Sequence, residues 1–183
     1  NLVDSDTSVE VWVAASGSPY IPPDGGFQLA DNVSVYGGFA GDPYETQLYH
    51  RDWVNNQTIL SGNRPAGKCT HVVVGAENAV LDGFIIEDGY ANGQEVHVYG
   101  GGMLNFYKAG STVTVRNCIF RNNGAVYCGG GLTNYNEGYE KPDTPYEISN
   151  CQFIENDADY GGAMYNRTNN HKISDCVFKS NTG

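Results

Sequence analysis

The segment RNCIFRNN at residues 116–123 decides the fold, because the chain repeats its pattern. It returns as SNCQFIEN at 149–156 and as SDCVFKSN at 174–181. The shared core is Asn or Asp, then Cys, any residue, Phe, two further residues and Asn. Repetition at intervals of about 20–50 residues is typical of a solenoid, in which each repeat packs only on its neighbours.

Side chains within each copy alternate, so that Cys and Phe share one face, as a half-buried strand requires. In a parallel solenoid, equivalent residues of successive copies stack about 4.8 Å apart. Asparagine suits the turn because it tolerates a left-handed backbone and its amide can bond the same residue one coil away. We therefore expect three structural ladders: Cys118, Cys151 and Cys176; Phe120, Phe153 and Phe178; and Asn123, Asn156 and Asn181.

A second element alternates with the first: GGGMLN at 100–105, GGGLTN at 129–134 and GGAMYN at 161–166. Its glycines are predicted to bend the chain where a Cβ would collide with neighbouring backbone. A weaker copy of the first element, LDGFIIED at 81–88, is aligned with Gly at the Cys position and Ile85 at the Phe position.

The glycine element together with Phe-x-x-Asn resembles the repeat signature of chlamydial polymorphic outer-membrane proteins and related bacterial proteins of the pectin-lyase-like superfamily. The resemblance covers about residues 80–183. Further upstream, VSVYGGFAG (33–41), RDW (51–53), TILSGN (58–63) and AVLDGF (79–84) look like the opening coils of large secreted bacterial proteins. This resemblance implies an all-β fold, a right-handed parallel β-helix.

Composition agrees with one such domain over residues 1–183, with irregular coils over 1–79 and clear repeats over 80–183. The chain has 24 Gly and 19 Asn among 183 residues, whereas strong helix formers are scarce. A net charge of −11 disfavours nucleic acid as a partner. No stretch approaches the roughly 20 apolar residues of a membrane-spanning helix. We expect the chain to be a fragment of a larger protein.

The resembled superfamily contains polysaccharide lyases, hydrolases and adhesins, so the fold alone does not define the function. Repeats are copies of one another, whereas an active site needs residues that break the repeat. We therefore expect a non-catalytic surface or structural module, adhesin-like, extracellular or at a bacterial cell surface, that contacts protein or polysaccharide. One alternative is a lyase or glycoside hydrolase; another is a fibre subunit that self-associates end to end beyond Asn181.

No catalytic residue is predicted. A hydrolase would need carboxylates on adjacent coils, but the position aligned with Asp82 holds Asn117 and Asn150 before Asp175. Arg116 and Arg121 lie on the outward face of their predicted strand, where a catalytic site of the resembled superfamily could lie, but surface solubility is the favoured explanation.

No cofactor and no metal is predicted, with calcium as the alternative. Acids that could supply oxygen ligands are Glu155, Asp157 and Asp159, with Asp4 and Asp6 as a thinner second group. Histidines without metal-ligand spacing, expected at the surface or in turns, are His50, His71, His97 and His171. Free thiols are favoured over a disulfide between neighbouring coils, because directly stacked side chains are poorly oriented for that bond.

The longest insertion within a clear coil runs from Tyr135 to Tyr146. Tyr135, Tyr139 and Tyr146 offer rigid amphipathic contact area, which favours a recognition loop. The alternative is that these rings lie back over the wall of the solenoid.

Overall fold

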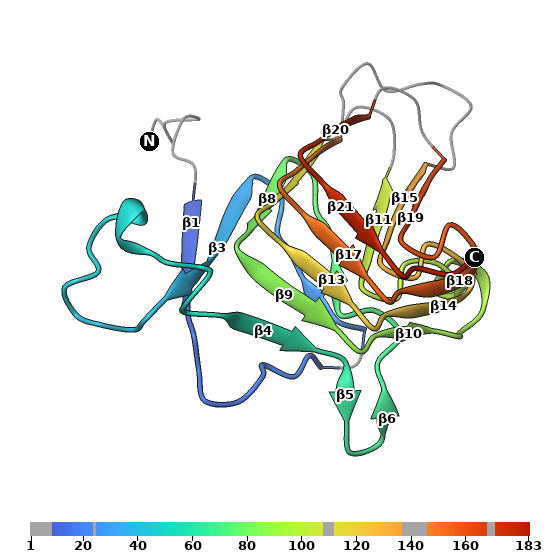
Figure 1. Ribbon diagram of the computed structural model, residues 1–183, viewed down its shortest axis with the longest axis horizontal. Helices are drawn as coiled ribbons and strands as arrows, with labels where there is room; N and C mark the ends of the chain where they lie inside the picture. The colour runs from blue at the N-terminus through green and yellow to red at the C-terminus, as the bar shows by residue number, and fades with distance from the viewer. Residues whose placement is uncertain (1–8, 24, 108–111, 137–145, 168–170) are drawn as a thin grey trace, which may run out of the picture.

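The computed structural model of the chain is a parallel β-helix built from stacked coils (Figure 1). It describes residues 9–23, 25–107, 112–136, 146–167 and 171–183. Strands of successive coils pair in parallel, and these pairings form four sheets that run along the stack. The predicted fold class, an all-β parallel solenoid, is confirmed.

Sheets 1 and 2 meet at a corner that carries most of the features discussed below. Sheet 1 contains, in spatial order, β1 (Val9–Ala14), β3 (Val33–Phe39), β8 (Ala79–Asp82), β12 (Val113–Arg116), β16 (Glu147–Ser149) and β20 (Lys172–Ser174). Sheet 2 contains β4 (Thr58–Ser61), β9 (Phe84–Glu87), β13 (Ile119–Arg121), β17 (Gln152–Ile154) and β21 (Val177–Lys179).

Two further sheets close each coil. Sheet 3 contains β10 (Tyr90–Ala91), β14 (Gly124–Cys128) and β18 (Asp157–Tyr160). Sheet 4 contains β2 (Phe27–Gln28), β7 (Val73–Val74), β11 (Met103–Tyr107), β15 (Leu132–Asn136) and β19 (Met164–Asn166). An antiparallel hairpin, β5 (Asn63–Arg64) with β6 (Gly67–Lys68), projects from the stack, and the short 3₁₀ helices are η1 (Leu48–His50) and η2 (Glu95–Val98).

The phenylalanines of sheet 2 form a stacked column inside the helix. Ring centroids of Phe120 and Phe153 lie 4.9 Å apart, and those of Phe153 and Phe178 lie 5.1 Å apart, with nearly parallel planes. These distances match the spacing of adjacent strands, so each ring repeats the position of the one before it. Phe120 and Phe153 are fully buried, whereas Phe178, in the last coil, is half exposed.

The asparagines at 123, 156 and 181 form a hydrogen-bonded column beside the phenylalanines. Asn156 Nδ2 donates to the carbonyl oxygen of Phe120 at 3.0 Å and to Asn181 Oδ1 at 2.9 Å. Its Oδ1 accepts from the backbone N–H and from Nδ2 of Asn123, at 3.1 and 3.0 Å. Each amide therefore satisfies buried backbone groups of the coil before it, which is why the sequence repeats this residue.

The left-handed turn residues lie one position earlier than the sequence analysis expected. Asp88, Asn122, Glu155 and Ser180 have φ between 53° and 60°, whereas the ladder asparagines do not appear among the residues with positive φ. The ladder asparagine is thus required for its amide, and the left-handed turn is made by the residue before it. Asp, Asn, Glu and Ser occupy that preceding position in the four coils, so the left-handed turn is made there without glycine.

The weak copy at 81–88 was aligned one residue out of register. Ile86, not Ile85, pairs with Phe120, and Asp82 pairs with Arg116 rather than Asn117. Gly83, with φ of 83°, occupies the left-handed turn that Asn117 makes in the next coil. A one-residue shift exchanges inner and outer faces in a strand, so this correction moves Ile85 to the outer face of sheet 2.

The glycine element allows backbone to approach backbone where sheet 3 turns into sheet 4. A Cβ added to Gly101 would lie 2.0 Å from the carbonyl oxygen of Gly124 in the following coil. No side chain fits there, so the predicted role of this element agrees with the geometry.

The three stacked cysteines are free thiols in this structure, as is Cys128, which pairs with Tyr160 of the following coil. Cys118 and Cys151 are buried and Cys176 is half-buried. Each thiol donates to the carbonyl oxygen two residues earlier at 3.2 Å. They behave as small core residues with a local hydrogen bond.

Candidate functional site

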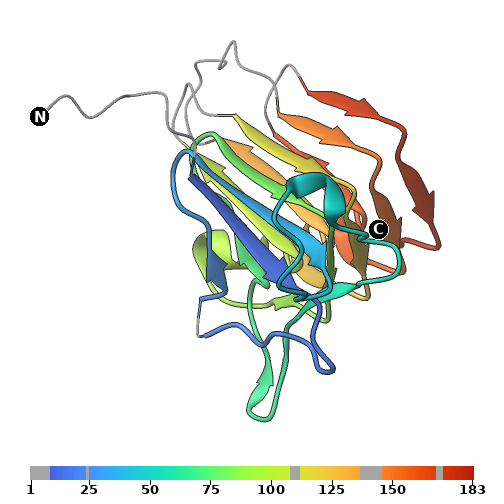
Figure 2. The same cartoon turned by 90° about the vertical axis from the view of Figure 1, so that its left-hand side faces the viewer.

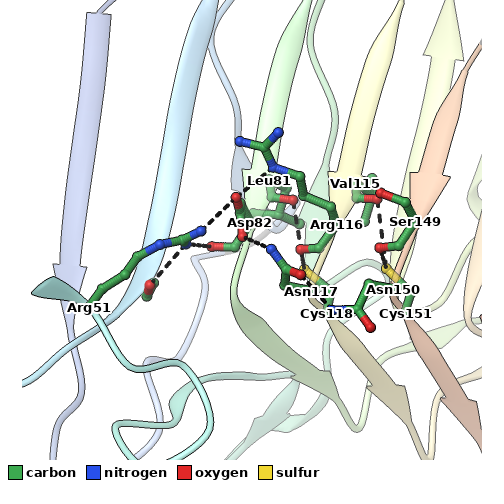
Figure 3. Close-up of polar contacts among 11 residues, drawn as sticks. Arg51, Leu81, Asp82, Val115, Arg116, Asn117, Cys118, Ser149, Asn150 and Cys151 are labelled. Atoms are coloured by element: carbon green, nitrogen blue, oxygen red, sulfur yellow. Dashed lines mark hydrogen bonds and ion pairs between the residues drawn. The ribbon is translucent and has the colours of Figure 1, made fainter. Parts of the chain in front are cut away.

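A buried carboxylate organises the corner between sheets 1 and 2. Asp82, at the end of β8, has 0% of its surface exposed. Its Oδ2 lies 2.8 Å from Arg51 Nη2 and 2.6 Å from Arg116 Nε, and its Oδ1 accepts from Asn117 Nδ2 at 2.7 Å. Figure 3 shows Arg51 reaching Asp82 from one side and Arg116 with Asn117 from the other. We call these four residues the Asp82 cluster.

Arg51 fixes the loop of residues 40–57, here called the insert loop, to the wall of the helix. Its Nη1 donates to the carbonyl oxygens of Gly37 and Asp82, both at 3.3 Å. Its guanidinium carbon lies 5.1 Å from the ring centroid of Tyr36 and 4.7 Å from that of Trp53. The buried ion pair and the two cation–π contacts therefore hold Trp53 in a defined position. Figures 1 and 2 both show the insert loop, which carries η1, outside the stack of coils.

The Asp82 cluster brings an acid and two arginines together, yet its role is structural and not catalytic. Both carboxylate oxygens of Asp82 are already engaged, and burial keeps a substrate away from them. Burial by itself lowers the pKa of Arg116, but the hydrogen bond to Asp82 and the charge of that carboxylate outweigh burial and raise it. Arg116 therefore stays cationic and does not provide the neutral base that a lyase mechanism requires.

A cleft of about 240 Å³ opens beside this cluster on the outside of the corner. The insert loop contributes Trp53, Val54 and Gln57 to one side of the cleft. Successive coils contribute the other side, with the apolar side chains of Ile85 and Ile119 and the amides of Asn117, Asn150 and Gln152. We call this hollow the Trp53 cleft.

The amides of the Trp53 cleft form a second asparagine ladder that is open to solvent. Asn150 Nδ2 donates to Asn117 Oδ1 at 2.7 Å, and Asn117 in turn donates to Asp82 (Figure 3). The exposed side chains of Gln57 and Gln152 make no hydrogen bond to another described residue. The cleft therefore combines amides that are oriented by the protein with amides that are free to meet a ligand.

The cleft is electrically neutral. None of the described residues that line it is acidic or basic; beside it, Arg51 and Arg116 share the single carboxylate of Asp82 and do not line the cleft. The arrangement can donate and accept hydrogen bonds and can stack a ring on Trp53. Its described lining holds no carboxylate, histidine or lysine that could serve as a general acid or base, and the buried thiol of Cys118 donates to the carbonyl oxygen of Arg116.

Trp53 also lines a second, more open hollow of about 570 Å³ together with Leu48, Tyr49 and Arg51. Tyr49 is 80% exposed. The two hollows share Trp53 and therefore adjoin at this side chain.

The predicted recognition loop is not supported as a unit. Tyr146 is only 1% exposed and packs in the core, and burial raises its pKa to about 12. Its role in recognition was predicted wrongly, because the residue begins the next coil and points inward. Tyr135 is half-buried under Arg167, whose guanidinium carbon lies 4.7 Å from the ring centroid, and Tyr139 lies outside the described residues.

The two arginines expected to serve solubility have specific partners instead. Arg121 Nη2 lies 2.6 Å from Glu87 Oε2 in the preceding coil, and Arg116 belongs to the Asp82 cluster. Since the sequence alignment was out of register, it hid both pairings.

The acids considered for calcium are spread along one turn and strand. Glu155 makes the left-handed turn, and Asp157 and Asp159 follow on β18, where Asp157 accepts a hydrogen bond from Thr182. Asp4 and Asp6 lie outside the described residues. Within the described ranges, no group of three or more His, Cys, Asp or Glu side chains is arranged to hold a metal ion. The absence of a metal stays a prediction, with calcium as its alternative.

His71 is a buried residue and not the surface or turn histidine that was predicted. It is 1% exposed, its Nδ1 lies 2.9 Å from the carbonyl oxygen of Gly100, and its Nε2 lies 3.0 Å from His97 Nδ1. A carbonyl oxygen only accepts, so Nδ1 carries the proton and Nε2 accepts from His97. Burial lowers the pKa of His71 to about 4, so the ring is neutral at pH 7.

Sequence reasoning missed Trp53 and Gln57 as site residues. The available signal was the insertion itself, since residues 40–57 separate two strands of one coil and contain one of the two tryptophans. The position of the loop depends on Arg51 reaching Asp82 across 31 residues, and local pattern does not reveal that contact.

Comparisons with models of protein families, with curated proteins and with solved structures found no match. Among the described residues, no helix has the length and apolar character needed to cross a membrane.

Proposed function

We propose that this chain is a non-catalytic, extracellular β-helix module of a bacterial surface protein, related to the pectin-lyase-like superfamily. Its function is to bind a ligand on its outer wall. The observation that carries the proposal is the Trp53 cleft, a preformed hollow lined by an indole, branched apolar side chains and amides, with no charged group among its described lining residues. Such a lining is suited to recognition and lacks the groups that bond cleavage needs.

The cluster of charges beside the cleft supports the same proposal. An inverting glycosidase needs two carboxyl groups roughly 6.5–9.5 Å apart with space for a water molecule between them. Here Asp82 is buried and bound by three side chains, and Asn117 and Asn150 line the exposed positions nearby. Asp82, Arg51 and Arg116 thus stabilise the insert loop and do not contact a substrate.

The alternative function, a polysaccharide lyase or glycoside hydrolase, is separated from the proposal by measuring binding and turnover in the same samples. The protein is incubated with a panel of acidic and neutral polysaccharides, and retention, new reducing ends and absorbance of unsaturated products are recorded. We expect retention of a polysaccharide without any product. Product formation by the wild-type chain that a heat-denatured sample of the same preparation lacks would overturn the non-catalytic function.

A further inference from the structure

We propose that the Trp53 cleft binds one ring of an uncharged carbohydrate chain, whose next unit extends toward Tyr49. This inference rests on the proposed function and adds the chemical class of the ligand and the direction in which it lies. It is carried by the size of the cleft, by its neutral hydrogen-bonding groups and by the prearranged indole.

The volume limits the ligand to a small unit. Pockets for drug-sized molecules measure roughly 300–1,000 Å³, and the cleft of about 240 Å³ lies below that range. A single ring of a longer chain fits this limit. The adjoining hollow of about 570 Å³, which shares Trp53 and adds Tyr49, provides the continuation.

The hydrogen-bonding groups match hydroxyls. Each amide offers both a donor and an acceptor, and each sugar hydroxyl likewise donates and accepts. Gln57 and Gln152 have no internal partner among the described residues, and Asn150 is held in place by donating to Asn117 at 2.7 Å. Three amides therefore surround the apolar floor made by Ile85 and Ile119, an arrangement that suits a ring with polar edges and apolar faces.

The charge balance selects against acidic sugars. A carboxylated sugar entering the cleft would lose water without meeting a cation, because none of the described lining residues is basic and the nearby Arg51 and Arg116 are both bound to Asp82 outside the lining. The net charge of −11 adds a general repulsion for polyanions. An uncharged carbohydrate chain has no charge to desolvate and is not repelled by the net charge of the protein.

The backbone around the cleft is already used, which disfavours a peptide that adds as a strand. The N–H of Asn117 donates to Ser149, that of Asn150 to Ser174 and that of Gln152 to Cys118, at 2.9–3.1 Å. Peptide recognition by strand addition requires a free sheet edge. At this wall of the helix the backbone groups named above are already bonded, so a ligand can bind only to side chains.

The indole of Trp53 is held before the ligand arrives. The guanidinium of Arg51 lies 4.7 Å from the ring centroid, and the side chain of Arg51 is itself fixed by Asp82. Prearranged groups lose little conformational freedom on binding, so a stacking contact here contributes most of its energy to affinity.

Affinity electrophoresis of the full chain through gels containing β-glucan, mannan, xylan or polygalacturonate tests the inference. Two cleft variants, Trp53→Ala and Gln152→Ala at an exposed position, are compared with Tyr160→Ala, which removes an aromatic side chain that is 57% exposed on sheet 3 and does not line the cleft. Circular dichroism establishes whether each variant is folded. If Trp53→Ala does not fold, Gln152→Ala still tests the inference.

We expect at least one uncharged polysaccharide to retard the wild-type chain. Trp53→Ala should weaken binding about tenfold or more and Gln152→Ala about threefold, whereas Tyr160→Ala should stay within about twofold. Retardation by polygalacturonate alone would overturn the inference and leave a non-catalytic binding function standing. Retardation by no polysaccharide would also overturn it, and shortening of any polysaccharide would instead overturn the proposed function.

Discussion

Two asparagine ladders of the same chemistry flank the strands of sheet 2, one directly before these strands and one after them, and they have different uses. The inner ladder, represented by Asn156, is buried and uses its amide on the backbone of the preceding coil. The outer ladder, represented by Asn150, is exposed, and its amide reaches only another side chain. A repeated residue therefore signals structure where its partners are backbone groups, and it becomes available for recognition where they are not.

The largest effect is expected from breaking the inner ladder. Asn156→Ala removes four hydrogen bonds and leaves the carbonyl oxygen of Phe120 and the N–H of Asn123 buried without this partner. We expect the free energy of unfolding to fall by about 4 kcal/mol, since each orphaned buried group costs about 1–3 kcal/mol. Urea unfolding followed by circular dichroism measures this loss. A loss below about 1 kcal/mol would show that the inner ladder is dispensable.

A smaller loss is expected from Asp82→Asn, which removes the charge that anchors the outer ladder. Arg51 would then be a buried cation without a carboxylate, which costs about 3 kcal/mol. The insert loop should detach first, so proteolysis within residues 40–57 should become faster before global unfolding changes. Glu147→Gln is the matched control, because its ion pair with Lys172 is exposed. Equal protease sensitivity in both variants would contradict the anchoring role.

Acid should lower the free energy of unfolding of the chain through His71, which belongs to neither ladder. Its pKa is lowered to about 4 in the folded chain by burial, against 6.5 when unfolded, so the unfolded chain binds more protons between these values. Stability is present above pH 6.5 and is lost as the pH falls toward 4, by about 2 kcal/mol between pH 7 and pH 5. His50→Ala should retain this loss, whereas His71→Gln should reduce it. An unchanged pH dependence in His71→Gln would contradict the assignment.

The smallest effect on stability is expected from Asn150→Ala in the outer ladder. Its amide is exposed and bonds only Asn117, so the free energy of unfolding should change by less than about 0.5 kcal/mol. Binding of the uncharged polysaccharide should nevertheless weaken several-fold, because the alanine removes an amide from the cleft. A stability loss comparable with that of Asn156→Ala would abolish the distinction between the two ladders.

The repeated part of the fold could be predicted from the sequence, whereas the site could not. The stacking of Phe120 on Phe153 follows from one residue pattern copied at a regular structural position. The weak copy containing Asp82 was misaligned by one residue, because Gly83 replaces the asparagine that marks the turn in later coils. The Trp53 cleft depends on a contact between an insertion and a distant coil, and a residue that occurs once leaves no pattern to detect.

Tryptophan fluorescence tests the central claim most directly, because the chain has only two tryptophans. Trp12→Phe keeps an aromatic ring stacked on Phe39 and leaves Trp53 as the single reporter. Titration of this variant with the uncharged polysaccharide that retards the wild-type chain should shift the emission of Trp53 and saturate. The same titration of Trp53→Phe should leave the emission of Trp12 unchanged. Emission of Trp53 that stays constant while the polysaccharide binds would place the ligand elsewhere and contradict the account.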